Sequence, residues 1–135
     1  MELNLRELNK GDYDTTLCPW WLAYGFTPPL KEFLPNNGEG GMIVYEGEEP
    51  ICAGYLYETN SSVAWSEWVI SDKNYVGDNK SEAVSLLLQG IEDLAKGKGF
   101  SFIFANNNNS ALVKHYKKNG YTVGCSDSTE IIKAI

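Results

Sequence analysis

Asn109 and Tyr116 combine residue types and a spacing that could support chemistry. An asparagine that begins a helix and a tyrosine seven residues later lie on nearly the same face, two turns apart. A tyrosine in this position packs its ring and can still present its hydroxyl to a cleft. Taken alone, the pattern favours a core tyrosine of an amphipathic helix.

The beginning of a helix predicted from residue 79 onward is a second candidate site. Strand, loop, helix and buried strand (residues 63–105) form a βαβ unit, and the unpaired N–H groups of such a helix end suit a phosphate. Asn79 and Glu82 are spaced as a capping box with Asn79 as the N-cap. The signal is generic, because many βαβ units bind nothing at this end.

Composition excludes several classes of protein. The 135 residues include 11 Lys and Arg against 18 Asp and Glu, and this net charge of -7 argues against nucleic acid as a partner. The apolar stretches are too short to span a membrane, and residues 1–10 do not resemble a secretory signal. Cys18, Cys52 and Cys125 are widely spaced, so we expect free thiols in a cytoplasmic protein and no metal site.

An ordered set of strands and helices has to position these residues. Strands are predicted at residues 2–8, 42–46, 51–59, 63–70 and 100–105, with a closing hairpin of residues 121–124 and 129–135. Helices are predicted after Asp12 or Asp14, from Asn79 to residues 96–99, and from Asn109 or Ser110 to residue 118. The order is strand, helix (with at most one further helical turn), three strands, helix, strand, helix, two strands. We therefore predict one mixed α/β, or α+β, domain over residues 1–135.

Two of these strands carry specific expectations about their faces. The strand at residues 100–105 is continuously apolar, which is typical of burial on both faces. Alternation in the strand at residues 63–70 places Trp65, Glu67 and Val69 on one face, and Ala64, Ser66, Trp68 and Ile70 on the other.

The βαβ unit followed by Asn109-x6-Tyr116-x3-Gly120-Tyr121 resembles the second half of the GNAT acetyltransferase superfamily, whose last block reads N-x6-Y-x3-G-[FY]. The order of elements agrees with that family over nearly the whole chain, and the motifs agree over residues 67–124. The resemblance implies a mixed central sheet splayed between its fourth and fifth strands, with acetyl-CoA in the cleft between residues 63–70 and 100–105.

The cofactor loop departs from the family pattern, which reads [QR]-x-x-G-x-[GA]. The aligned residues are Asn79, Lys80, Ser81, Glu82, Ala83 and Val84. Asn79 replaces the Gln or Arg, and Glu82 and Val84 replace the glycines; an alignment on Gly77 also lacks the second glycine. As a capping-box acid, Glu82 would compete with a pyrophosphate for the same N–H groups, and Lys80 would compensate in part.

The resemblance also implies roles for individual residues. The backbone of Val69 and Ile70 would hold the pantetheine arm and polarise the thioester carbonyl, and Tyr116 would protonate the departing thiolate. Glu67 is either the base for the acceptor amine or an exposed strand carboxylate. Asn109 either contacts the cofactor arm or only caps its helix.

Two groups of conspicuous residues have more ordinary interpretations. His115 is expected at the surface. Trp20, Trp21, Tyr24 and Phe26 either belong to the core, which we favour, or form a wall of the acceptor site.

The sequence thus predicts an acetyl-CoA-dependent N-acyltransferase that acts by direct transfer on a primary amine of a small molecule or peptide. We expect no membrane or nucleic-acid partner and consider a homodimer through an exposed strand edge. The alternative is a non-catalytic binding or dimerisation module with a decayed cofactor loop, suggested by Glu82 and Val84. A nucleotide-binding βαβ domain is weaker, because no Gly-rich loop follows the first strand.

Overall fold

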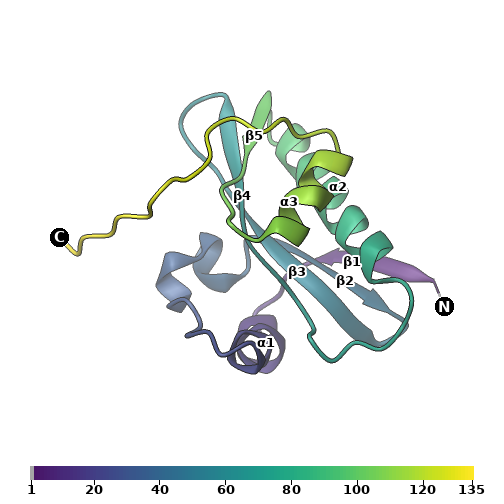
Figure 1. Ribbon diagram of the computed structural model, residues 1–135. Helices are drawn as coiled ribbons and strands as arrows, with labels where there is room; N and C mark the ends of the chain where they lie inside the picture. Colours follow the sequence, from purple (N-terminus) through teal and green to yellow (C-terminus); the bar gives the residue numbers. More distant parts are fainter. Residues whose placement is uncertain (1) are drawn as a thin grey trace.

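A five-stranded sheet runs through the centre of the computed structural model, which describes residues 2–135 (Figure 1). The strands are β1 (Leu3–Glu7), β2 (Gly41–Glu46), β3 (Glu49–Tyr57), β4 (Val63–Ser71) and β5 (Phe102–Phe104). They lie in sequence order, with antiparallel pairing from β1 to β4 and parallel pairing of β4 with β5. The predicted mixed sheet and three-strand meander are confirmed.

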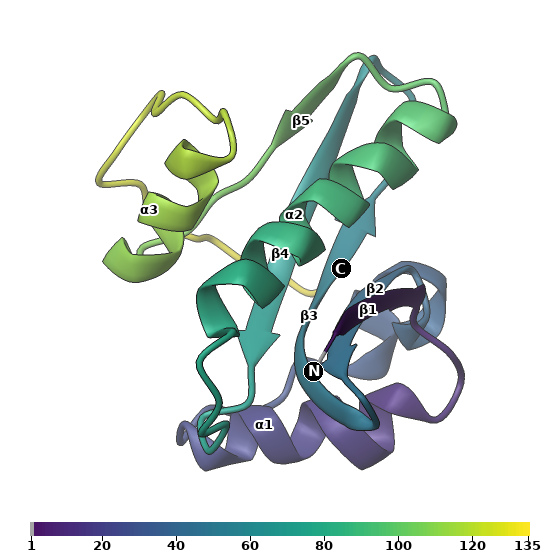
Figure 2. The same ribbon diagram turned by 90° about the vertical axis from the view of Figure 1, so that its right-hand side faces the viewer.

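Helices cover both faces of this sheet, as Figure 1 and Figure 2 show together. They are α1 (Cys18–Ala23) with the preceding π-helical turn η1 (Tyr13–Leu17), α2 (Lys80–Gly97), α3 (Ser110–Lys118), and the 3-10 turns η2 (Lys31–Phe33) and η3 (Pro35–Gly38). One core cluster joins α2 and α3 to the sheet, and a second joins α1 to the opposite face. No helix among residues 2–135 is long and apolar enough to cross a membrane.

The stripe predicted for α2 forms the larger core. Val84, Leu87, Leu88, Ile91 and Ala95 recur every three or four residues and are all buried. Burial of a side chain of this size contributes about 1.5–3 kcal/mol, so this face holds α2 on the sheet far more strongly than helix propensity does.

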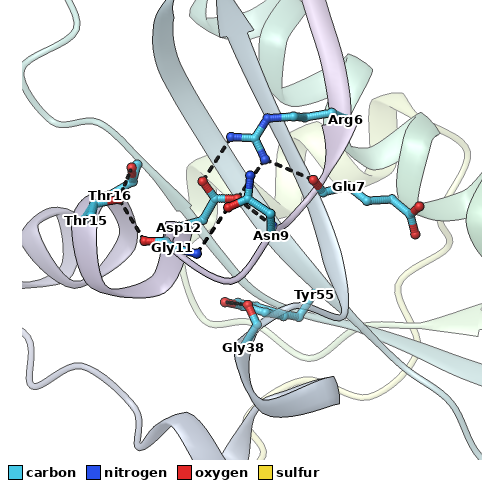
Figure 3. A network of polar contacts seen from close by, with 9 residues as sticks. All are labelled: Arg6, Glu7, Asn9, Gly11, Asp12, Thr15, Thr16, Gly38 and Tyr55. Atoms are coloured by element: carbon cyan, nitrogen blue, oxygen red, sulfur yellow. Dashed lines mark hydrogen bonds and ion pairs between the residues drawn. The ribbon is translucent and has the colours of Figure 1, made fainter.

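A partly buried ion pair fixes the chain where it leaves β1 and enters η1 (Figure 3). Both terminal guanidinium nitrogens of Arg6 donate to the carboxylate of Asp12, at 2.7 and 3.0 Å, and the N–H of Asn9 donates to the same carboxylate at 2.7 Å. Burial alone would raise the pKa of Asp12, but these hydrogen bonds and the Arg6 charge hold it below its usual value. Asp12 therefore stabilises this corner through Arg6, without a side-chain hydrogen bond to its own helix.

A β-bulge in β4 overturns part of the predicted face assignment. Ala53 pairs with Ile70 and Tyr55 with Glu67, so Trp68 and Val69 together stand opposite the single residue Gly54. Because the extra residue shifts the alternation by one, Val69 packs on the α2 face and Ile70 on the α1 face. The prediction that Val69 shares a face with Glu67 is therefore wrong. The prediction that Trp68 and Ile70 share the face of Ala64 and Ser66 is wrong for the same reason.

The end of the chain also differs from the prediction. β5 spans only Phe102–Phe104, with Phe102 and Phe104 63% and 49% exposed, so it is not buried on both faces. Residues 121–135 form no hairpin; the segment passes beside β5 and β4, and only its last residues extend away from the sheet (yellow in Figure 1). A two-stranded hairpin is marginal in water without a packed apolar face, and every residue from 122 to 135 is exposed.

Candidate active site

The sheet opens between β4 and β5, as expected. The two strands pair only from Val63–Phe102 to Trp65–Phe104, while β4 continues to Ser71. Beyond Phe104 the chain leaves β4 and leads into α3 (Figure 2). The backbone of β4 from Ser66 onward therefore lacks a partner strand on this side, and Ser66 and Glu67 lie where the gap begins.

Tyr116 reaches this gap from α3. Its side chain is 6% exposed, and its hydroxyl lies 2.9 Å from the hydroxyl of Ser66. Burial raises the pKa of Tyr116 to about 12, against a smaller opposing effect of the Ser66 hydrogen bond. Tyr116 is therefore a protonated, positioned donor at neutral pH.

Asn109 and Tyr121 support this placement of Tyr116. The Asn109 carboxamide oxygen accepts from the N–H groups of Ala111 and Leu112 at 3.0 and 3.1 Å, which fixes the beginning of α3. The ring of Tyr121 packs edge-on against Tyr116 with centroids 4.8 Å apart. Of the two roles considered for Asn109, the helix cap is confirmed, and its side-chain oxygen is occupied by that role.

Glu67 lies on the opposite face of β4 from Ser66 and spans the gap. Its carboxylate accepts from the backbone N–H of Asn106, beyond the end of β5, at 2.7 Å. Burial raises the pKa of Glu67 above its usual value; the Asn106 hydrogen bond lowers it, and the charge of Glu130 adds to the increase. A half-buried carboxylate with a raised pKa is suited to accept a proton.

Trp68 is the functional candidate that alternation did not identify. At the bulge it adopts φ 59°, a left-handed conformation that is a genuine outlier for so large a residue. Its indole N–H donates to the hydroxyl of Tyr57 at 2.9 Å, and its ring packs edge-on against Trp21 at 6.3 Å. Strain of this kind clusters at functional sites, and the bulge interrupts the ladder beside Val69. Periodicity carries no signal for a bulge.

Asn79 begins α2 as predicted, but the capping box is not formed. The Asn79 side chain donates to the Glu46 carboxylate at 2.6 Å, and the Tyr75 hydroxyl donates to the same carboxylate at 3.2 Å. The Asn79 N–H donates to the Tyr75 hydroxyl at 3.3 Å, so Glu82 does not occupy it. The prediction of a capping box is wrong because a charged acceptor from β2 lies within reach of Asn79 and binds its carboxamide instead.

The first turn of α2 consequently has no side-chain cap. Lys80 and Glu82 are exposed and Ser81 is half-buried, whereas Ala83 and Val84 face the core, and the Ala83 N–H already donates to the Asn79 carbonyl. Gly77 precedes this turn, and a side chain at position 77 would overlap the Tyr75 hydroxyl. Open backbone donors and one lysine fit a phosphate group.

The remaining sequence candidates lie elsewhere. Trp20 and Trp21 belong to the core on the α1 face, as favoured, whereas Phe26 is exposed. His115 is partly exposed, which agrees with the expected surface position, and its partial burial lowers its pKa. Within residues 2–135, no three His, Cys, Asp or Glu side chains are grouped as metal ligands would be.

No family model matches the chain, and no curated protein matches it significantly. Several solved structures, in contrast, match nearly the whole of this chain. N-acetylglutamate synthase from Neisseria gonorrhoeae, complexed with coenzyme A and N-acetyl-glutamate, superposes with a TM-score of 0.72 at 17% identity, over 96% of this chain and 30% of that one.

Two similar structures have lengths closer to that of this chain. Glucosamine-6-phosphate N-acetyltransferase from Arabidopsis thaliana has a TM-score of 0.66 at 12% identity, over 98% of this chain and 100% of that one. Ribosomal-protein-S18-alanine N-acetyltransferase from Escherichia coli has a TM-score of 0.66 at 13% identity, over 92% and 80%. The chain therefore has the fold of the GNAT N-acetyltransferases.

Proposed function

We propose that the protein is an acetyl-CoA-dependent N-acetyltransferase that modifies a primary amine by direct transfer. The observation that carries this proposal is the meeting of Tyr116 with Ser66, next to Glu67, where β4 and β5 separate. It places a proton donor and a proton acceptor on opposite faces of one strand. Two of the similar structures are enzymes named for N-acetylation, of glucosamine-6-phosphate and of a ribosomal-protein alanine.

The cofactor would lie between the beginning of α2 and the bulge of β4. In this proposal the N–H groups of Lys80, Ser81 and Glu82 and the Lys80 ammonium hold the pyrophosphate. The backbone of Val69 and Ile70 holds the pantetheine arm and polarises the carbonyl. Acetyl-CoA supplies the acetyl group as an activated thioester. The non-catalytic alternative loses support, because Glu82 does not bind the Asn79 N–H.

The proton transfers follow from the two side chains. Glu67 takes a proton from the acceptor ammonium, so that the amine nitrogen can form its bond to the acetyl carbon. As the carbon–sulfur bond breaks, Tyr116 donates its proton to the sulfur, and Ser66 keeps the Tyr116 hydroxyl oriented. The new amide nitrogen gives its second proton to water, and the Tyr116 phenolate takes a proton back from water. The raised pKa of each group agrees in direction with these roles.

Assembly and location are further parts of the proposal. The exposed edge of β5 is where we expect a second copy to pair in a homodimer. The three cysteines, Cys18, Cys52 and Cys125, are free thiols, which agrees with a location in the reducing cytoplasm.

The proposal is tested by release of free thiol from acetyl-CoA in the presence of a panel of amines. Tyr116→Phe should lower kcat by about 10²–10⁴. Tyr121→Phe is the matched control, because it removes the hydroxyl of the adjoining ring, which has no hydrogen-bond partner. Equal rates for Tyr116→Phe and the parent would remove Tyr116 from the mechanism.

A further inference from the structure

A hollow of about 410 Å³ lies on the α1 face of the gap, on the Glu67 side of β4. Its lining combines three aromatic rings (Tyr57, Trp65, Trp68) with three carboxylates (Glu58, Glu67, Glu130) and Thr59. A cavity with both aromatic faces and carboxylates is the chemistry that recognises an organic cation.

The aromatic walls are fixed before any ligand binds. The Trp68 indole donates to the Tyr57 hydroxyl at 2.9 Å, and this hydroxyl in turn donates to the Phe33 carbonyl at 2.7 Å. Trp65 packs edge-on against Phe104 with centroids 5.2 Å apart. Both donors of the Tyr57–Trp68 pair are therefore satisfied within the protein, which leaves the ring faces available for a cation.

The carboxylates leave two negative charges without a counter-charge. Glu58 forms an ion pair with Lys98 at 3.3 Å, whereas Glu67 and Glu130 have no ion-pair partner among the described residues. Glu130 comes from the segment after α3, which is joined to the gap by a hydrogen bond from Ser128 to the Asn106 side chain at 3.3 Å. The Asn106 N–H also holds Glu67, so Asn106 contacts both the Glu67 carboxylate and the segment that carries Glu130.

We propose that the acceptor is a dicationic alkylamine, which the two carboxylates and the aromatic rings recognise together. This inference rests on the proposed function. One ammonium group lies beside Glu130 among the rings and keeps its charge. The other loses a proton to Glu67; its nitrogen then bonds to the acetyl carbon while the thioester carbon–sulfur bond breaks and the sulfur takes a proton from Tyr116. The new amide nitrogen gives its second proton to water, and the Tyr116 phenolate takes a proton back from water.

The test is calorimetric titration of the full chain, without acetyl-CoA, with three four-carbon compounds: 1,4-diaminobutane, butylamine and 4-aminobutyrate. We expect the diamine to bind at least tenfold more tightly than butylamine, and 4-aminobutyrate to bind more weakly than either. Glu130→Gln should reduce this preference to less than threefold. Glu48→Gln, at the exposed tip between β2 and β3, is the matched control and should leave the preference unchanged.

Equal affinity for the three compounds, or an unchanged preference in Glu130→Gln, would overturn the inference. Titration of the same samples with acetyl-CoA separates it from the proposed function. Binding of acetyl-CoA without binding of the diamine contradicts the dicationic acceptor alone. Binding of the diamine without binding of acetyl-CoA supports the cation pocket and contradicts the acetyltransferase.

Discussion

Removal of the hydrogen bond between Ser66 and Tyr116 should destabilise the fold by an amount that its burial determines. Tyr116→Phe leaves the Ser66 hydroxyl, on a residue that is 1% exposed, without its side-chain partner. An unsatisfied buried polar group costs about 1–3 kcal/mol. Because the ring itself and its packing against Tyr121 remain, we expect a loss of about 1–2 kcal/mol, which corresponds to roughly 3–8 °C in Tm for a chain of this size.

A double-mutant cycle checks that magnitude by urea unfolding monitored by circular dichroism. Ser66→Ala should cost about as much as Tyr116→Phe, whereas the double variant should cost little more than either alone, because two apolar groups then face each other. The coupling energy should be about 1 kcal/mol. Tyr121→Phe should change the stability by less than about 0.5 kcal/mol, since no hydrogen bond is lost. Full additivity of the two substitutions would refute the argument.

Three further changes test other parts of the molecule. Glu67→Gln should reduce kcat/KM by about 10²–10⁴ and abolish the acidic limb of the parent pH–rate profile. The midpoint of that limb should lie above the usual glutamate pKa, because burial raises the pKa of Glu67. A variant that keeps the limb would contradict the role of Glu67 as the base. Glu82→Gln should tighten acetyl-CoA binding about two- to fivefold in calorimetry, since it removes a negative charge from the first turn of α2; unchanged affinity places the pyrophosphate elsewhere. Asp12→Asn should cost about 1–2 kcal/mol at pH 7, less than a fully buried pair because Arg6 is 37% exposed. Because folding lowers the pKa of Asp12, its contribution to the free energy of unfolding is complete above the unfolded pKa of about 3.9 and is lost as pH falls through the folded-state pKa. A difference in stability between the variant and the parent that persists at pH 2 in urea melts would contradict this linkage.

Local patterns predicted the elements whose signals are contained in a few neighbouring residues. The apolar stripe from Val84 to Ala95 defines α2, because its period matches the helix and its face is buried by the sheet. Asn109 and Gly120, with φ 95°, mark the two ends of α3 for reasons of capping and backbone conformation. The family resemblance that includes the N-x6-Y spacing implied that Tyr116 acts at the cleft between β4 and β5, whereas its contact with Ser66 was not anticipated.

Two of the misses depend on partners that are distant in sequence, and a third depends on tertiary packing. The bulge at Trp68 arises from the register between β3 and β4, which alternation within one strand cannot reveal. The capping box failed because Glu46, 33 residues away, binds the Asn79 side chain. The closing hairpin was inferred from local strand propensity, which does not supply the packed face that such a hairpin requires.

Titration of the intact protein with acetyl-CoA tests the central claim most directly. The expected result is micromolar affinity that is retained with desulfo-CoA and absent with ATP. Acetyl-CoA and desulfo-CoA share a pyrophosphate, which the open first turn of α2 would bind, and a pantetheine arm, which the backbone at the bulge would bind. Absence of heat at millimolar acetyl-CoA would contradict the acetyltransferase account.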